Sequence, residues 1–557
     1  MPRSIAVGLT CWLAATTAWA QADLVLRGGP IHTAEDGAPM AEAVAVDDGR
    51  IVYVGAASGV RALIGPATEV IELEGAALYP GFTDAHAHLL GIGMREMTLN
   101  LERVASLADL VDAVRARVAE AEPGAVVTGR GWIETHWPEA RFPTAADLDA
   151  AAPDNPVILT RADGHALVAN SAALAAAGID AATPVPAGGD ILRDEAGQPA
   201  GMLIDNAMGL LAGVMLKPTP ARRKAALETG ASVYARYGWT GVHNMSVDPA
   251  DLGLIALLAD QGRLPLRVYN SVDRAGADAL LATGAHTTAS GRVVTRAIKL
   301  YADGALGSRG AALFDPYSDA DTAGLLLIGR DEILPILTAA LRRGIQVNTH
   351  AIGDKANRLV LDWYAEALAA VPVAQRAVAQ PRWRIEHAQV VHGDDHARFA
   401  QLGVIASMQP SHAISDLHFA PDRLGLDTGR LAGAYAWASL LEAGAIIAGG
   451  SDAPVERGDP AIEFYAAVAR RDLSGYTGPG WHADQAVDRQ TALKMFTLWP
   501  AYAAFQEDEL GSITVGKRAD FTALSHDIMT VPEREIVQAR AVLTVVDGTI
   551  VHRAEGW

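Results

Sequence analysis

Short apolar runs alternate with helical patterns through the middle of the chain. Amphipathic stretches such as Asp331–Arg343 and Lys355–Ala370 separate the later runs. Strands that alternate with helices are typical of a parallel sheet, and eight such strands close a (β/α)8 barrel. The eight predicted barrel strands are Leu78–Asp84, Thr240–Asn244, Pro265–Asn270, Arg296–Tyr301, Ile345–Thr349, Trp383–Glu386, Val404–Met408 and Ala445–Gly449.

Three further regions surround the predicted barrel, which spans residues 79–500. Residues 21–78 and 501–557 are both β-rich, with short strand-like runs broken by Gly-Pro and Asp-Gly turns. The simplest explanation is one small β-sandwich assembled from both termini. The gap between the first two barrel strands is too long for one helix, so we expect an α/β insertion over about 95–237. Its predicted elements are strands Val126–Gly129 and Val157–Thr160 and a returning helix Ala221–Tyr237.

Residues 1–20 have the pattern of a secretory signal peptide. Arg3 supplies a positive charge, Ile5–Ala15 is apolar, and Ala18-Trp19-Ala20 fits a cleavage site. Arg3 has no adjacent second arginine, which favours the general secretion route. The only cysteine, Cys11, lies inside this segment, so the mature chain would have neither disulfides nor thiolate metal ligands. We therefore expect a secreted or periplasmic protein.

Composition narrows the classes of partner. The 557 residues are half hydrophobic, enough for a large core, and the formal net charge is -20. This acidity argues against nucleic-acid or anionic-membrane partners. After the signal segment no apolar run reaches the length of about 18 residues that a membrane span needs. The expected partner is a small-molecule substrate; the oligomeric state stays open, with a homodimer as one option.

Metal-capable side chains stand where the predicted barrel strands end. Because the carboxyl ends of parallel strands share one face of a barrel, we expect them to converge on one or two divalent metals. In the His-x-His pair of the first strand, residues i and i+2 point to the same side and can hold one metal. The six predicted ligands are His86, His88, Lys299, His350, His387 and Asp452.

Each predicted ligand also has a plainer interpretation. His86 and His88 could be two incidental surface histidines. Lys299 would be costly as a buried ammonium, so it could take up carbon dioxide and bridge two metals as a carbamate. Alternatively it could pair with Asp303. His350 and His387 could hold a second metal or be hydrogen-bonded core histidines. Asp452 could bind metal and accept a proton from water, or it could cap a helix before Ala453-Pro454.

The substrate pocket is less sharply defined by the sequence. The insertion is expected to lie over the barrel mouth, where loops build the site. The predicted substrate-binding residues are Trp132, His165, Asp303, Arg309, Gln409 and His412. Alternatives were open for most of them: Trp132 could be plain core, Asp303 and Arg309 could pair with each other, and Gln409 and His412 could serve loop hydrogen bonding.

Several longer strings resemble the amidohydrolase superfamily, and in particular its YtcJ-like branch, which includes N-substituted formamide deformylases. They are Gly129-Arg130-Gly131-Trp132, Asp163-Gly164-His165, Lys299–Arg309, His350–Asp354 and Leu510–Asp520. The resemblance implies an α/β fold: a distorted (β/α)8 TIM-type barrel with a small β-sandwich built from both termini and an α/β insertion after the first barrel strand. It also implies hydrolysis of carbon–nitrogen bonds and one or two divalent metals, commonly zinc.

The predicted activity is hydrolysis of an amide-like bond, in a compound such as an N-formyl or N-acyl derivative, by metal-activated water with Asp452 as the base. A lactonase or esterase with the same metal site is an alternative, since no residue separates ester from amide cleavage. A secreted non-catalytic binding protein is disfavoured, because leaving six intact ligand positions buried without metal would cost roughly 1–3 kcal/mol for each unpaired group.

Overall fold

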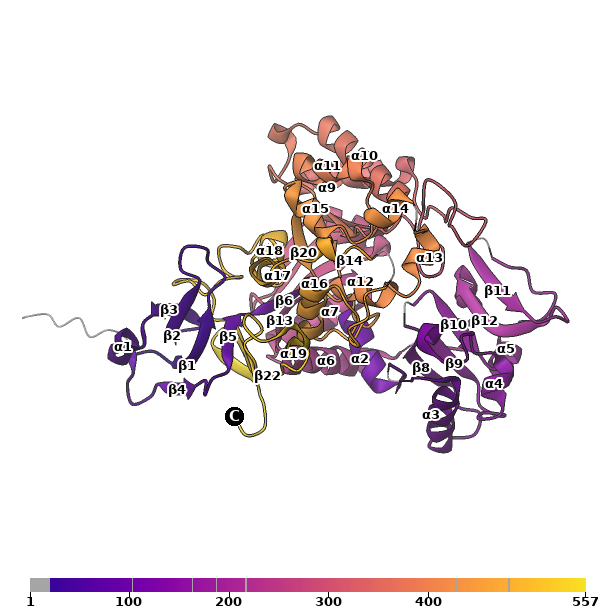
Figure 1. The fold of residues 1–557 in the computed structure, drawn as a ribbon, viewed down its shortest axis with the longest axis horizontal. Helices are drawn as coiled ribbons and strands as arrows, with labels where there is room; N and C mark the ends of the chain where they lie inside the picture. The colour runs from indigo at the N-terminus through magenta and orange to yellow at the C-terminus, as the bar shows by residue number, and fades with distance from the viewer. Residues whose placement is uncertain are drawn as a thin grey trace, which may run out of the picture.

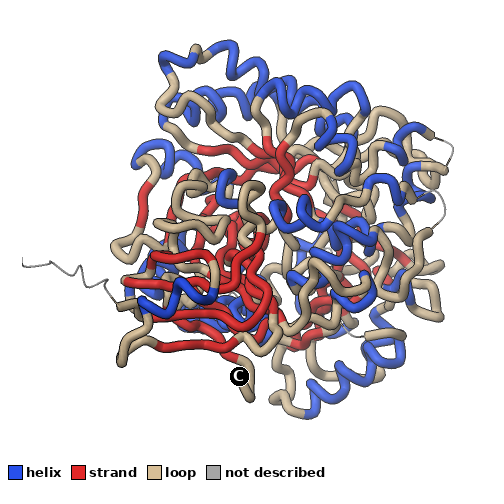
Figure 2. Tube along the Cα trace, turned by 60° about the vertical axis from the view of Figure 1, so that its left-hand side comes forward, coloured by secondary structure: helices blue, strands red, loops and turns tan. Residues whose placement is uncertain are grey.

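A nearly closed parallel barrel forms the centre of the protein (Figures 1 and 2). The computed structural model describes residues 21–102, 104–162, 164–186, 188–215, 218–426, 428–478 and 481–557. The barrel strands pair in chain order, and the last lies beside the first. This confirms the predicted barrel. The strands are β6 (Phe82–Ala87), β13 (Trp239–Val247), β14 (Arg267–Val272), β16 (Val293–Tyr301), β17 (Gln346–Ala351), β18 (Arg384–His387), β19 (Ile405–Met408) and β20 (Ile446–Gly449).

The first predicted barrel strand, Leu78–Asp84, is wrong as a single element. Its beginning forms β5 (Ala77–Pro80) in a different sheet, and the barrel strand β6 starts only after Gly81. The backbone N–H of Gly81 donates to the carbonyl of Asp520 at 2.8 Å. A Cβ atom at Gly81 would lie 2.2 Å from Oγ1 of Thr240. The chain therefore crosses from one sheet to the other at Gly81, where there is no room for a Cβ atom.

Strands from both ends of the chain form one eight-stranded sheet, at the left of Figure 1. An irregularity in its strand β1 lets residues 24–27 pair with β4 while Ile31 pairs with β5. Successive side chains of β1 enter different apolar cores, as strand alternation requires: Leu26 packs into one and Val25 into the other. The strands are β1 (Leu24–His32), β2 (Met40–Asp47), β3 (Arg50–Gly55), β4 (Glu69–Glu72), β5, β21 (Phe521–Leu524), β22 (Ala541–Val546) and β23 (Thr549–Arg553).

Helices cover the outside of the barrel (Figure 2). In α9 the buried residues recur three and four apart, and the left-handed Gly344 ends the helix. No helix in the described ranges is both long and apolar enough to cross a membrane. The predicted signal peptide, residues 1–20, lies outside those ranges. The main helices are α7 (Pro249–Asp260), α8 (Ala277–Thr283), α9 (Arg330–Arg343), α10 (Asp354–Ala370), α11 (His396–Leu402), α15 (Trp437–Glu442), α17 (Arg489–Met495) and α18 (Leu498–Ala503).

Most of the chain between β6 and β13, from β8 to β12, forms a separate layer at the right of Figure 1. It contains a six-stranded sheet in the order β11-β12-β10-β9-β8-β7, with its own apolar cores. The helices α2 (Leu89–Met97) and α6 (Pro220–Tyr237) lead out of and back into the barrel and pack on each other. The other elements are β7 (Leu99–Asn100), α3 (Leu107–Ala119), β8 (Val127–Trp132), α4 (Ala145–Asp149), β9 (Val157–Arg161), β10 (Ala166–Ala169), α5 (Ser171–Ala177), β11 (Gly189–Arg193) and β12 (Pro199–Asp205).

The contact between α2 and α6 depends on Gly93 and Gly230, and it gives a direct test of the fold. A Cβ atom at Gly93 would lie 1.7 Å from the carbonyl oxygen of Ala226. We expect Gly93→Ala to lower the free energy of unfolding by about 1–3 kcal/mol, because the helices must move apart. Chemical denaturation of the purified protein measures this.

The matched control is Gly253→Ala in α7, where no atom lies within 4 Å of the added Cβ. There we expect a gain of about 0.4–1 kcal/mol, because alanine restricts the unfolded chain. Equal denaturation midpoints for the two variants would contradict the close packing of α2 on α6.

Candidate metal centre

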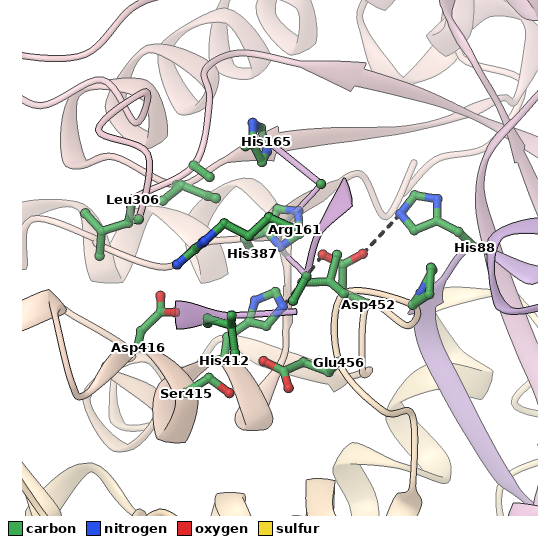
Figure 3. Close-up of a pocket in the computed structure, with 18 of the residues that line it drawn as sticks. His88, Arg161, His165, Leu306, His387, His412, Ser415, Asp416, Asp452 and Glu456 are labelled. Atoms are coloured by element: carbon green, nitrogen blue, oxygen red, sulfur yellow. Dashed lines mark hydrogen bonds and ion pairs between the residues drawn. The ribbon is translucent and has the colours of Figure 1, made fainter. Parts of the chain in front are cut away.

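All six predicted ligands line one cavity of about 560 Å³ at the carboxyl ends of the barrel strands (Figure 3). His86 and His88 come from the end of β6, Lys299 from β16, His350 from β17 and His387 from β18, and Asp452 follows β20. The convergence expected of strand ends in a parallel barrel therefore brings them together.

Three of these side chains lie closest to one another. One ligand atom each from His86, His387 and Asp452 lies within 4.8 Å of the other two. Lys299 Nζ donates to His86 Nε2 at 3.3 Å, and a hydrogen bond of 3.0 Å joins His88 Nε2 to Asp452 Oδ1, drawn as a dashed line in Figure 3. His350 stands beside this group, its ring centroid 4.5 Å from that of His387.

Unusual backbone places two of the ligands. His387 and Asp452 have φ angles of 72° and 58°, in the left-handed region that non-glycine residues rarely adopt. The Asp452 N–H donates to the carbonyl of His86 at 2.6 Å, which ties the loop after β20 to β6. The helix-cap alternative for Asp452 is wrong, since the next helix, α16 (Pro460–Ala469), is capped by Asp459. Strain of this kind is concentrated at functional sites.

The charge states of these groups suit a cation. Burial, together with the nearby Lys299, lowers the pKa of His86 to about 4. Burial lowers the pKa of His350 and of His387 well below the usual value, so all three imidazoles are neutral and can donate a lone pair. Burial alone would raise the pKa of Asp452, but its contact with His86 and its hydrogen bond with His88 outweigh burial and hold that pKa well below its normal range. Neutral imidazoles beside an ionised carboxylate form a donor set that fits a divalent transition metal.

A buried ion pair behind the cavity orients His86. Glu386 Oε2 accepts a hydrogen bond from His86 Nδ1 at 2.5 Å, and Glu386 Oε1 lies 2.8 Å from Arg384 Nε. Both charged side chains are fully buried. With Nδ1 engaged, only Nε2 of His86 is left to face the cavity. Neither residue of this pair was among the predicted site residues; the signal in the sequence is two opposite charges, two residues apart, within a predicted barrel strand.

Gln409 acts on the metal ligands rather than on the cavity. It is buried, and its amide oxygen lies 2.8 Å from Nδ1 of His387, which leaves Nε2 of that ring for the cavity. Its amide nitrogen donates to the carbonyl of Ser407 at 3.2 Å. The side chain therefore makes the hydrogen bonds of the alternative interpretation, and its contact with substrate stays a prediction. Such outer partners fix the tautomer of a ligating histidine.

Three other predicted substrate residues do not face the cavity as proposed. Trp132 is fully buried in the core of the insertion, and its indole N–H donates to the carbonyl of Leu159 at 3.0 Å. Asp303 accepts backbone hydrogen bonds from three residues of the surrounding loops, and burial raises its pKa to about 7. Arg309 pairs with Asp319 at 2.8 Å, so neither the Asp303–Arg309 pair nor the Lys299–Asp303 pair forms.

His165 and His412 do line the cavity, on opposite walls (Figure 3). His165 comes from the insertion and pairs with Asp205 at 2.8 Å. His412 Nε2 stands 3.7 Å from Asp452 Oδ2. Several other charged residues that line the cavity were not predicted as site residues. They are Arg130, Arg161, Asp416 and Glu456, of which only Arg130 stands in one of the quoted strings.

A comparison with protein-family models matches residues 69–552 to an amidohydrolase family. The chain is 33% identical to the putative amidohydrolase YtcJ of Bacillus subtilis, over 95% of this chain and 99% of that one. It is 29% identical to an N-substituted formamide deformylase of Arthrobacter pascens, over 96% and 99%. Among solved structures, an uncharacterized metal-dependent hydrolase from Pyrococcus horikoshii superposes with a TM-score of 0.74 at 26% identity, covering 92% of this chain and 99% of that one.

The barrel, the ligand set and these matches define a metal-dependent hydrolase that acts on carbon–nitrogen bonds other than peptide bonds. The chain belongs to the amidohydrolase family.

The orienting role of Gln409 can be tested through metal binding. We expect Gln409→Ala to weaken metal affinity roughly 10–100-fold, because the His387 ring loses the acceptor that holds its tautomer. Competition with a chromophoric chelator measures the dissociation constant. Gln409→Glu keeps an oxygen acceptor and should bind metal nearly as the parent does; equal affinity of the alanine variant and the parent would sink the assignment.

Proposed function

We propose that this protein hydrolyses the carbon–nitrogen bond of a small amide, such as an N-formyl or N-acyl compound, with zinc as the metal. The observation that carries the proposal is the approach of His86, His387 and Asp452 to within 4.8 Å of one another beside an open cavity. Nitrogen and carboxylate donors without thiolates are compatible with catalytic zinc. The similarity to an N-substituted formamide deformylase supports an amide substrate.

The chain's own residues supply binding and proton transfer. His86, His387 and Asp452 would hold the metal, with His88, Lys299 and His350 beside them. The bound metal supplies a water of lowered pKa and polarises the substrate carbonyl.

Asp452 is placed for the proton transfers of this reaction. It accepts the proton of the attacking water and returns it to the leaving nitrogen, which departs poorly as an anion. Nε2 of His412 has no hydrogen-bond partner among the described residues and stands 3.7 Å from Asp452 Oδ2. It can therefore donate a hydrogen bond to the carbonyl oxygen as negative charge develops there.

Lys299 is proposed to act as a carbamate. Burial lowers the pKa of its ammonium to about 8, so a fraction is free amine near neutral pH. The amine nitrogen forms a bond to the carbon of carbon dioxide, and one N–H proton leaves to water. The product carries one negative charge shared by two oxygens close to His86, and these oxygens would help His86 to hold a metal.

Export from the cytoplasm is proposed from the N-terminal sequence. The charge of Arg3, the apolar segment Ile5–Ala15 and the small residues around Ala20 support a cleaved signal peptide. Metal would then be acquired outside the cytoplasm.

The role of Asp452 predicts a selective loss of turnover. We expect Asp452→Asn to lower kcat roughly 10²–10⁴-fold, because an amide cannot accept the proton. Activity on N-formyl and N-acyl amines should be expressed per bound metal, since the same side chain is a proposed ligand. Asp508→Asn, at an exposed position, is the matched control. Near-normal turnover per bound metal in Asp452→Asn would refute the proton-transfer role.

The carbamate predicts chemical rescue at Lys299. We expect Lys299→Ala to lose metal and activity, and to regain part of both with acetate or propionate, which can supply the missing oxygens inside the vacated space. Lys299→Met fills that space and should not respond. Metal analysis and activity with and without the acids measure this; full metal binding by Lys299→Met would contradict a bridging role.

A further inference from the structure

A second cavity opens beside the catalytic one. It has a volume of about 310 Å³ and lies among the segments that follow the barrel strands β19 and β20. It shares Ser415, Glu456 and Arg457 with the main cavity, so one molecule can reach into both. Figure 3 shows Ser415 and Glu456 at this edge, below Asp452. We call it the side cavity.

The side cavity is acidic. Glu456, Glu463 and Asp472 line it. Asp472 is neutralised in part by His418, at 3.1 Å, which leaves the two glutamates facing one guanidinium, that of Arg457. Burial, with Asp416 and Asp452 nearby, raises the pKa of Glu456 to about 8. Burial also raises the pKa of Glu463 well above its usual value. Both glutamates therefore favour the protonated form, and a cation beside them would stabilise the ionised form.

Glu463 carries an unsatisfied carboxyl oxygen in the side cavity. It stands in the first turn of α16 and is fully buried. Leu473 and Ser474, which also line the side cavity, are exposed. Oε2 of Glu463 accepts the backbone N–H of Ser411 at 3.0 Å, but its Oε1 has no hydrogen-bond partner among the described residues. A buried carboxyl oxygen without a donor destabilises the fold unless a ligand supplies one.

The missing donor has the character of an organic ammonium. A metal would need several ligand atoms close together, and within the described ranges only His86, His387 and Asp452 meet a 4.8 Å spacing. An ammonium carries three donors on a flexible stem and can serve carboxyl groups that are further apart. A neutral alcohol would not stabilise the ionised forms of Glu456 and Glu463.

We propose that the side cavity binds an ammonium group of the substrate, so that the enzyme acts on amides of small amines that carry a second, cationic nitrogen. This inference rests on the proposed amide hydrolysis. The scissile amide would lie at Asp452, and the alkyl chain would pass Ser415 and Glu456 to place the ammonium beside Glu463.

The test compares charged and neutral substrates of equal length on the metal-loaded enzyme. The charged series runs from N-formyl-diaminopropane to N-formyl-diaminohexane; in the neutral series a methyl group replaces each ammonium. We expect the best charged compound to exceed its neutral partner in kcat/KM by about 10–100-fold, the usual worth of hydrogen bonds to a charged group. Equal values across both series would overturn the proposal.

Two variants assign the preference to this cavity. Glu463→Gln and Glu456→Gln should each bring the charged-to-neutral ratio down towards one, mainly through KM for the charged compound. The melting temperature of Glu463→Gln should hold or rise, because a buried unpaired acid is removed. An unchanged ratio together with a lower melting temperature would make Glu463 purely structural and overturn the proposal. Glu533→Gln is the matched control, on α19 (Glu533–Ile536), which packs on α16 but exposes Glu533 to solvent.

A binding measurement separates this inference from the proposed function. If no amide is hydrolysed, the proposed function fails, and calorimetric titration of the metal-loaded protein decides the side cavity alone. Pentylammonium should bind at least about tenfold more tightly than pentanol, and the difference should vanish in Glu463→Gln. Equal affinity for the two compounds would reject an ammonium site whatever the enzyme's reaction.

Discussion

The ion pair between Arg384 and Glu386 is the interaction on which the metal centre depends. Two opposite charges are removed entirely from water inside the barrel, an arrangement that is stable only when every partner is in place. Arg384 also donates to Ser407 Oγ at 2.6 Å, and Glu386 receives the His86 ring. The pair therefore links the strand β18 to Ser407 on β19 and fixes the orientation of the His86 ring. The other predicted ligands lie around that ring.

The sequence could predict the parts of the site that follow from strand periodicity. His86, His350 and Asp452 stand where apolar strands end, and parallel strands end at one face, so their convergence needed no tertiary information. Strand periodicity does not predict where the side chains beyond the strand ends point. Trp132 stands in a motif-like string and Gln409 directly follows a barrel strand, yet Trp132 enters the core of the insertion and Gln409 turns to His387.

A continuous apolar run in the sequence can also form strands of two different sheets. The run that contains Gly81 has no polar interruption, and only the close approach of Thr240 and Asp520 shows why the chain leaves one sheet and enters another there. The buried pair of Arg384 and Glu386 was missed for a related reason. Charges within a strand suggest exposure until the partners on neighbouring strands are known. Long-range contacts, rather than local propensity, decide both features.

The left-handed backbone at His387 and Asp452 restricts which residues these two positions can accept through evolution. Asparagine, aspartate, histidine and glycine tolerate that conformation, whereas β-branched residues are strongly disfavoured. Selection for the conformation and selection for metal binding overlap in aspartate and histidine alone. A descendant that had lost catalysis would still be kept from β-branched residues at both positions, so its inactive barrel would retain this constraint of the ancestral centre in its backbone.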